Sequence, residues 1–226
     1  MGKKKKKKKA PEQADQAQAP EQGKAAADGA AEKPAKAKKK RKPRKPDFYT
    51  TLYPSVELGP LTLASDGERL VGLWLPGQKY YGATLEGKVA EDDSLPVFAQ
   101  VKEWLDRYFA GEQPPIFALP LAPIGTDFRH RVWRKLITIP YGQTRTYGQL
   151  AQELADEDGN DKMSAQAVGG AVGHNPISII IPCHRVVGAD GSLTGYAGGV
   201  EKKVFLLEHE GVDMSGLTVP KKGTAL

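Results

Sequence analysis

The sharpest change along the 226-residue sequence separates a basic, aromatic-free beginning from all that follows. Residues 1–46 hold 17 lysines and arginines against 5 acidic residues, a net charge of +12, and no aromatic side chain. Such a segment buries too little apolar surface to offset the entropy lost on ordering, so we expect it to be disordered. Residues 47–226 hold 16 basic and 22 acidic residues, a net charge of −6, and all the aromatic residues. The folded part is therefore expected to begin near Asp47.

The sequence contains one cysteine, Cys183, and four scattered histidines. A single cysteine cannot form an intramolecular disulfide, and these residues lack the spacing of a structural zinc site. We therefore expect neither a metal nor a cofactor. No apolar stretch is long enough to span a bilayer, so we expect a soluble protein. We also expect it to be a monomer and to lie in the cytoplasm, or in the nucleus if the cell is eukaryotic.

The first folded region, expected at residues 47–122, combines short strands with one helix. Two β-prone runs, 60–65 and 69–75, flank the turn signal Ser65-Asp66-Gly67 and predict a hairpin. Residues 95–110 place apolar side chains at helical spacing, and Gly111 ends the run. This order predicts a small domain with an antiparallel sheet and an amphipathic helix.

The second region, expected at residues 126–212, is mainly helical. Thr126 and Asp127 can cap a helix that continues to about Ile137. Thr146 opens a second helix over 147–155, and Ser164 opens a third over 165–173. The last two helices, joined by an Asp/Gly/Asn loop, resemble a helix-turn-helix, although generic helix pairs are far more numerous.

The segment around the cysteine follows these helices. Ile177–Ile181 is apolar apart from Ser178 and is bounded by a proline on each side, which we interpret as a buried strand with Cys183 at its end. A glycine-rich loop over 188–199 and a helix over 200–209 come next, and 213–226 is expected to be a flexible tail.

A lone cysteine is most often a small buried hydrophobe, but the neighbours of Cys183 favour a nucleophile. A thiol attacks carbon only as the thiolate, and a nearby base or cation lowers its pKa. His184 and Arg185 follow it directly, and the rigid Pro182 precedes it. The pattern therefore favours a reactive thiol.

The pentapeptide Pro182-Cys-His-Arg-Val lies between Gly-His-Asn-Pro-Ile and the later motifs Gly195-Tyr-Ala-Gly-Gly and Leu206-Leu-Glu-His-Glu-Gly. Together these motifs resemble the O6-alkylguanine-DNA alkyltransferase family. The resemblance covers about 47–212 and is dense over 126–211. It implies an α+β fold: a disordered basic tail, a small ribonuclease-H-like domain, and a mainly helical catalytic domain with a helix-turn-helix.

The resemblance also implies a reaction, the repair of double-stranded DNA by moving a methyl or larger alkyl group from O6-alkylguanine onto Cys183. O4-alkylthymine is a second candidate substrate. The thioether offers no route to hydrolysis, so each protein molecule acts once. His184 would deprotonate Cys183 through a water, Glu210 would orient His184, Asn175 would join this network, and Tyr147 would donate a proton to the departing base.

Other residues would contact DNA after the damaged nucleotide is flipped out of the duplex. Backbone groups at Cys183, Val186, Tyr196 and Ala197 would hold the base edges, and the glycine-rich 165–173 helix would enter the minor groove. The predicted substrate and DNA contacts are Ala165, Gln166, Gly169, Gly170, Arg185, Val186, Tyr196 and Ala197. Gln166 departs from the arginine that many members place in the hole left by the flipped base.

Three alternatives remain from the sequence. The first is a sensor that binds alkylguanine without repairing it, although relatives of that kind have the cysteine replaced. The second is a cysteine hydrolase, which the adjacency of Cys183 and His184 disfavours. The third is a nucleic-acid-associated or ribosome-associated chaperone that depends on the basic tail.

Overall fold

The computed structural model describes residues 45–220 of the chain. The predicted disordered tail, residues 1–46, lies outside the described residues except for Lys45 and Pro46. Within the described range, no helix is long and apolar enough to cross a membrane.

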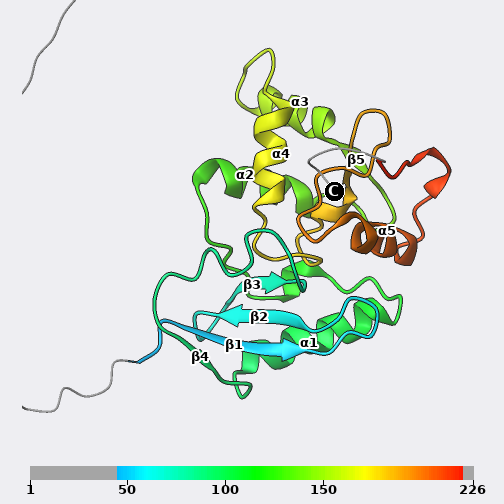
Figure 1. Ribbon diagram of the computed structural model, residues 1–226. Helices are drawn as coiled ribbons and strands as arrows, with labels where there is room; N and C mark the ends of the chain where they lie inside the picture. Colours follow the sequence, from blue (N-terminus) through cyan, green and yellow to red (C-terminus); the bar gives the residue numbers. More distant parts are fainter. Residues whose placement is uncertain (1–44, 221–226) are drawn as a thin grey trace, which may run out of the picture. The chain divides into compact units, whose positions relative to one another are not determined.

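The first half of the folded region contains a four-stranded sheet with the order β3-β2-β1-β4 (Figure 1). Its strands are β1 (Phe48–Tyr53), β2 (Leu61–Ser65), β3 (Leu70–Trp74) and β4 (Val89–Glu91). The β1–β2 and β2–β3 pairs are antiparallel, and β4 pairs with β1 in parallel. The predicted hairpin is confirmed as β2–β3. Strand β4 was not predicted, because its three residues are too few to form an alternating pattern.

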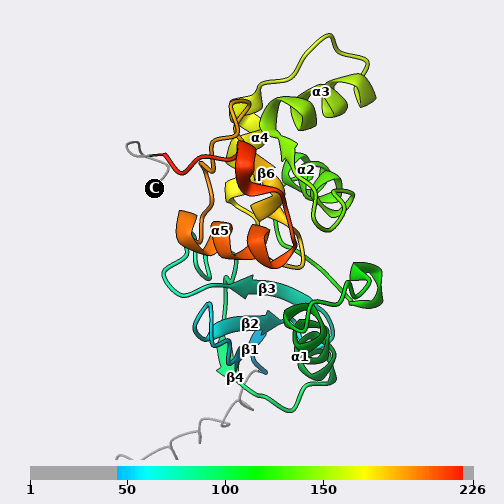
Figure 2. The same cartoon turned by 90° about the vertical axis from the view of Figure 1, so that its right-hand side faces the viewer.

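One amphipathic helix, α1 (Pro96–Phe109), packs beside this sheet (Figure 2). It starts with a proline in the first turn, where the missing amide hydrogen costs nothing. After its last turn, Gly111 adopts a positive φ of 82°, which favours glycine. The predicted helix over 95–110 is confirmed. A short 3₁₀ turn, η1 (Ile116–Ala118), follows.

The second half begins with three helices: α2 (Asp127–Ile137), α3 (Tyr147–Glu157) and α4 (Ala165–Gly173). Their first residues agree with the sequence prediction because each is preceded by a side-chain cap. The oxygens of Thr126, Thr146 and Ser164 each accept a hydrogen bond from a backbone amide of the first turn. Thr146 and Gln149 complete a reciprocal capping box.

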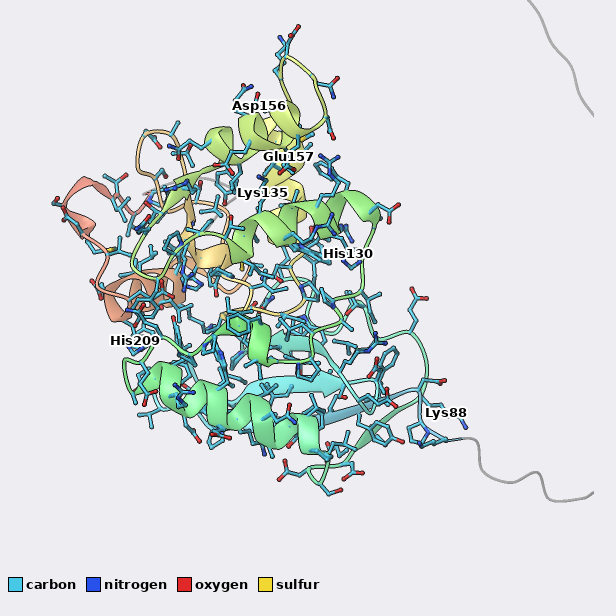
Figure 3. All side chains as sticks on the ribbon, turned by 180° about the vertical axis from the view of Figure 1, so that it is seen from behind. Lys88, His130, Lys135, Asp156, Glu157 and His209 are labelled. Carbon is cyan, nitrogen blue, oxygen red and sulfur yellow. The ribbon has the colours of Figure 1, made fainter. Side chains whose placement is uncertain are left out.

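Helix α2 packs against both α3 and α4. The indole Nε1 of Trp133 donates to the Ala171 carbonyl of α4 at 2.9 Å, deep in the core. At the surface, the Lys135 ammonium lies 2.6 Å from the Glu157 carboxylate of α3 (Figure 3). These contacts fix the positions of α3 and α4 through a third helix.

The predicted strand over Ile177–Ile181 is wrong in conformation, although the segment is buried. It contains one isolated bridge, from Ile177 to Leu73, and then turns back on itself. Ile179 adopts a positive φ of 68°, and the Ile181 amide donates to the Ile177 carbonyl at 3.0 Å. A short apolar run indicates burial, but it does not distinguish a strand from a buried turn.

A two-residue parallel pair joins α3 to the cysteine segment. Strand β5 (Arg145–Thr146) lies directly before α3, and β6 (Val186–Val187) directly follows the 3₁₀ turn η2 (Cys183–Arg185). This pairing holds the start of α3 close to the cysteine turn.

Helix α5 (Val200–His209) confirms the last predicted helix. The segment after it differs from the flexible tail expected from residue 213. It forms the 3₁₀ turn η3 (Met214–Gly216), and Thr218 exchanges backbone hydrogen bonds with the glycine-rich loop, accepting from Leu193 at 2.9 Å and donating to Gly191 at 3.0 Å. Residues 221–226 lie outside the described part of the chain.

Candidate functional site

Cys183 lies at the first residue of η2, with its residue only 5 % exposed. The side-chain amide of Asn175 donates to Cys183 Sγ at 3.1 Å and to the Ile181 carbonyl at 2.7 Å, while its oxygen accepts from the Ile177 amide at 3.0 Å. Asn175 therefore stabilises the turn that presents the sulfur and also contacts the sulfur itself. Burial raises the pKa of the Cys183 thiol, although the Asn175 hydrogen bond and the Lys203 charge act in the opposite direction.

His184 is fully buried and faces away from solvent towards Glu210. Its Nε2 lies 2.7 Å from Glu210 Oε1. A carboxylate can only accept, so Nε2 carries the hydrogen and Nδ1 is left as an acceptor. Burial lowers the pKa of His184, and the neighbouring Glu210 opposes this shift. Nδ1 is buried and has no hydrogen-bond partner among the described residues, so a neutral ring presents a free base there.

The Glu210 carboxylate is the centre of a buried cluster. Arg185 binds it through two nitrogens, Nε at 2.7 Å and Nη2 at 2.9 Å, and the Tyr108 hydroxyl donates to it at 2.8 Å. Burial alone would raise the pKa of Glu210, but the His184 and Arg185 hydrogen bonds and charges hold it well below its usual range. Glu210 is therefore ionised and its position is fixed from several sides.

Lys203, on α5, is a fully buried cation near the same sulfur. Its ammonium donates to the Val186 carbonyl at 2.5 Å and to the Thr194 carbonyl at 2.9 Å. Burial lowers the pKa of Lys203 to about 8, against the opposing attraction of Cys183. Its two carbonyl partners flank the cysteine turn on one side and the glycine-rich loop on the other, so Lys203 ties both segments to α5.

Tyr147, the first residue of α3, lies between α4 and the glycine-rich loop. Its hydroxyl donates to the Thr194 carbonyl at 3.2 Å, and a Cβ added at Gly195 would lie only 2.6 Å from that hydroxyl. Gly195 also has a positive φ of 75°, so glycine is required there for two reasons. Burial raises the pKa of Tyr147 far above its ordinary value, which keeps the phenol protonated as a donor.

Tyr196 is also buried close to the sulfur, and its hydroxyl has no hydrogen-bond partner among the described residues. A cavity of about 450 Å³ opens beside it. The cavity is lined by the second half of α4, by residues 195–199 and by residues 77–80. Buried polar atoms without partners are uncommon. Two of them belong to residues beside the cysteine: Tyr196, which interacts electrostatically with Cys183, and His184, which follows Cys183 in the chain.

Two family models match the described region. The model described as 6-O-methylguanine DNA methyltransferase, ribonuclease-like domain, matches residues 48–123, and the corresponding DNA binding domain model matches 127–212. A methylated-DNA–protein-cysteine methyltransferase of Haemophilus influenzae is 44% identical over 163 residues, which is 72% of this chain and 86% of the relative. The chain belongs to the methylated-DNA–protein-cysteine methyltransferase family.

Further relatives agree with this family assignment. A methyltransferase of Mycobacterium leprae is 45% identical, over 68% of this chain and 87% of that protein. The crystal structure of Mycobacterium tuberculosis OGT in complex with DNA is 46% identical and superposes with a TM-score of 0.58, over 72% of this chain and 91% of that one. The methyltransferase fold therefore extends over both halves of the described region.

The structure brings together all five residues predicted for the chemistry. The cysteine turn carries Cys183 and His184, and Asn175, Glu210 and Tyr147 each lie within hydrogen-bond or electrostatic reach of that turn. Four predicted DNA contacts lie along α4: Ala165, Gln166 and Gly170 are exposed, and Gly169 is partly exposed. Tyr196 and Ala197 line the cavity.

Arg185 is not placed as we predicted. We expected a substrate or DNA contact, but the side chain is only 6 % exposed, and three of its nitrogens donate to Glu210 and to the Ile139 carbonyl. The physical reason is the buried Glu210 carboxylate, which needs a cationic partner. Val186 is also buried, and its carbonyl accepts from Lys203, which leaves one lone pair for a ligand.

Sequence reasoning missed two contributors to this site. Lys203 lies three residues before Leu206 and four before Leu207, and it shares the buried face of α5 with them. A lysine on the apolar face of a predicted helix was the sequence signal that could have identified it. Tyr108 lies 102 residues from Glu210, and no local pattern links the two. Among residues 45–220, no group of three or more histidine, cysteine, aspartate or glutamate side chains is placed to hold a metal ion.

Proposed function

We propose that the protein repairs DNA by a single, direct transfer of an alkyl group from O6-alkylguanine to Cys183. The observation that carries this proposal is that Cys183 and its neighbour His184 are both buried, with His184 bound to Glu210 and Asn175 donating to the sulfur. The name of the relatives states the same class of reaction. The chemistry of each step can be assigned to atoms of this chain.

In the proposed step, His184 Nδ1 takes the thiol proton of Cys183 through a water molecule. The thiolate attacks the alkyl carbon, so an S–C bond forms as the C–O6 bond breaks and its electron pair moves onto the guanine. Tyr147 donates a hydrogen bond to the guanine as this charge develops. Glu210 stabilises the imidazolium that His184 becomes. The thioether has no leaving group that water can displace, so the protein is consumed.

Recognition would use the backbone of the cysteine turn and the glycine-rich loop. We propose that carbonyls at Cys183 and Val186 and amides at Tyr196 and Ala197 hold the edges of the flipped base. Helix α4 would enter the minor groove, where its exposed Gly170 allows the helix backbone to approach DNA closely. The α3–α4 pair would then act as the helix-turn-helix, and α2, which packs on both, as its support.

We also propose that residues 47–122 and 126–212 act as two domains, the first ribonuclease-H-like, and that the protein works as a monomer in the cytoplasm, or in the nucleus of a eukaryote. The matched family models divide the chain at almost the same boundary.

A count of turnovers tests the proposal against its alternatives. The protein is incubated with a fivefold excess of a duplex containing one O6-methylguanine, and the demethylated strand is quantified over time. We expect product to stop at one equivalent per protein molecule. Continued production would indicate a hydrolase, whereas tight binding without product would indicate a sensor, and either result would refute the proposal.

A further inference from the structure

The cavity beside Tyr196 is lined in part by the first half of the chain. Ligand pockets commonly measure 300–1,000 Å³, and this one measures about 450 Å³. Seven of its twelve lining residues are glycines, so few side chains face its interior. The large ones are Lys79, Tyr80, His174 and Tyr196. Only a few aromatic side chains are therefore available to stack on a flat ligand in this cavity.

Two of these side chains form a stacked pair across the halves of the chain. The rings of Tyr80 and His174 lie 3.9 Å apart, centroid to centroid, and are inclined by 19°. His174 is fixed at the end of α4 because its Nδ1 donates to the Gly170 carbonyl at 2.7 Å. Tyr80 has a positive φ of 63°, which is costly for a residue with a side chain and persists only when its surroundings hold it.

The segment that contains Tyr80 is held by the glycine-rich loop, residues 188–199, which we propose contacts the base. The Lys79 amide donates to the Ala197 carbonyl at 2.9 Å. The ammonium of Lys202 donates to both the Pro76 carbonyl, at 2.9 Å, and the Gly198 carbonyl, at 3.2 Å. The segment 76–80 is therefore attached directly to the glycine-rich loop, which lines the same cavity, so a ligand held by that loop would lie within reach of the Tyr80 ring.

We propose that the Tyr80–His174 stack is the outer wall of the site for the alkylated base, with the Tyr80 ring in contact with the bound purine and its O6 substituent. This inference rests on the proposed function and deepens it. A flat apolar ring gains more from a large aromatic substituent than from a methyl group, because more surface is buried. The ligand class is therefore an O6-substituted guanine, and the wall favours larger substituents.

The test compares Tyr80→Gly with Tyr80→Phe. Glycine removes the ring and also relieves the positive φ, so a loss of activity cannot be attributed to backbone strain. Phenylalanine keeps the ring. The matched control is Tyr81→Ala, because Tyr81 is the adjacent exposed tyrosine and its hydroxyl instead meets Thr62 on the sheet at 2.7 Å. The readout is the second-order rate of Cys183 alkylation by free O6-benzylguanine and by an O6-methylguanine duplex.

We expect Tyr80→Gly to reduce the benzylguanine rate by roughly tenfold and the methylguanine rate by a smaller factor. Tyr80→Phe should recover most of the loss, and Tyr81→Ala should match the wild type. An unchanged benzylguanine rate in Tyr80→Gly would overturn the proposal. A loss confined to the duplex would also overturn it, because the ring would then contact the DNA strand and not the base. A wild-type protein that never alkylates Cys183 would refute the proposed function itself.

Discussion

Glu210 carries a buried negative charge that His184, Arg185 and Tyr108 all contact. Removing one partner from a buried ion pair leaves the other charge uncompensated, which costs about 3–5 kcal/mol. We therefore expect Glu210→Gln to lower the free energy of unfolding by about that amount at pH 7. Urea denaturation measures it. The matched control is Glu208→Gln, because Glu208 is exposed two residues earlier and should be nearly neutral.

The same residue predicts a pH dependence. The folded-state pKa of Glu210 lies well below its ordinary value of 4.5, so its contribution to stability is complete above that value. The contribution is lost as the pH falls from about 4.5 towards the folded-state pKa. The difference in unfolding free energy between the wild type and Glu210→Gln should therefore be present at pH 5 to 7 and shrink in acid. A difference that does not change with pH in acid would contradict the ionised, paired carboxylate.

Gln166 lies near the exposed N-terminal end of helix α4, where the family resemblance led us to expect an arginine. If this residue fills the space left by the flipped base, an arginine there should fill more volume and add a favourable charge. We expect Gln166→Arg to raise the transfer rate on an O6-methylguanine duplex and to leave the rate with free O6-benzylguanine unchanged, since the free base needs no flipping. Equal changes with both substrates would place Gln166 at the cysteine site.

The helices of this region could be predicted from the sequence because their start signals are local. Thr126, Thr146 and Ser164 each cap the helix that follows, and the structure begins all three helices at the next residue. The Ile177–Ile181 segment could not be predicted in the same way. Its shape depends on the side-chain amide of Asn175 and on the positive φ of Ile179, and neither is visible as a pattern of apolar residues.

For the candidate site, too, some features could be predicted from the sequence and others could not. The motif around Cys183 indicated the nucleophile, the family resemblance implied that His184 is its base and Glu210 the carboxylate, and the structure places His184 against Glu210. The inward direction of Arg185 could not be predicted, because it depends on where Glu210, 25 positions further along the chain, lies after folding. Tyr80 was also missed, since its stacking on His174 requires the first half of the chain to meet α4.

The distribution of charge over the whole molecule predicts a role for the basic tail in finding DNA. Residues 1–46 carry +12 and residues 47–226 carry −6. Each phosphate contacted steepens the salt dependence of binding by about 0.9 log unit per log unit of salt. A chain beginning at Asp47 should bind undamaged duplex more weakly at low salt, with a flatter slope, and should alkylate free O6-benzylguanine at an unchanged rate. Indistinguishable slopes would exclude the tail from DNA binding.

The central claim is that one alkyl group moves to one sulfur. The most direct measurement is the intact mass of the protein after incubation with a duplex containing a single O6-methylguanine, followed by peptide mapping. We predict a gain of one methylene per molecule, located on the peptide that contains Cys183, and no gain in Cys183→Ala. An unchanged mass, a second addition, or modification of any other residue would contradict the claim.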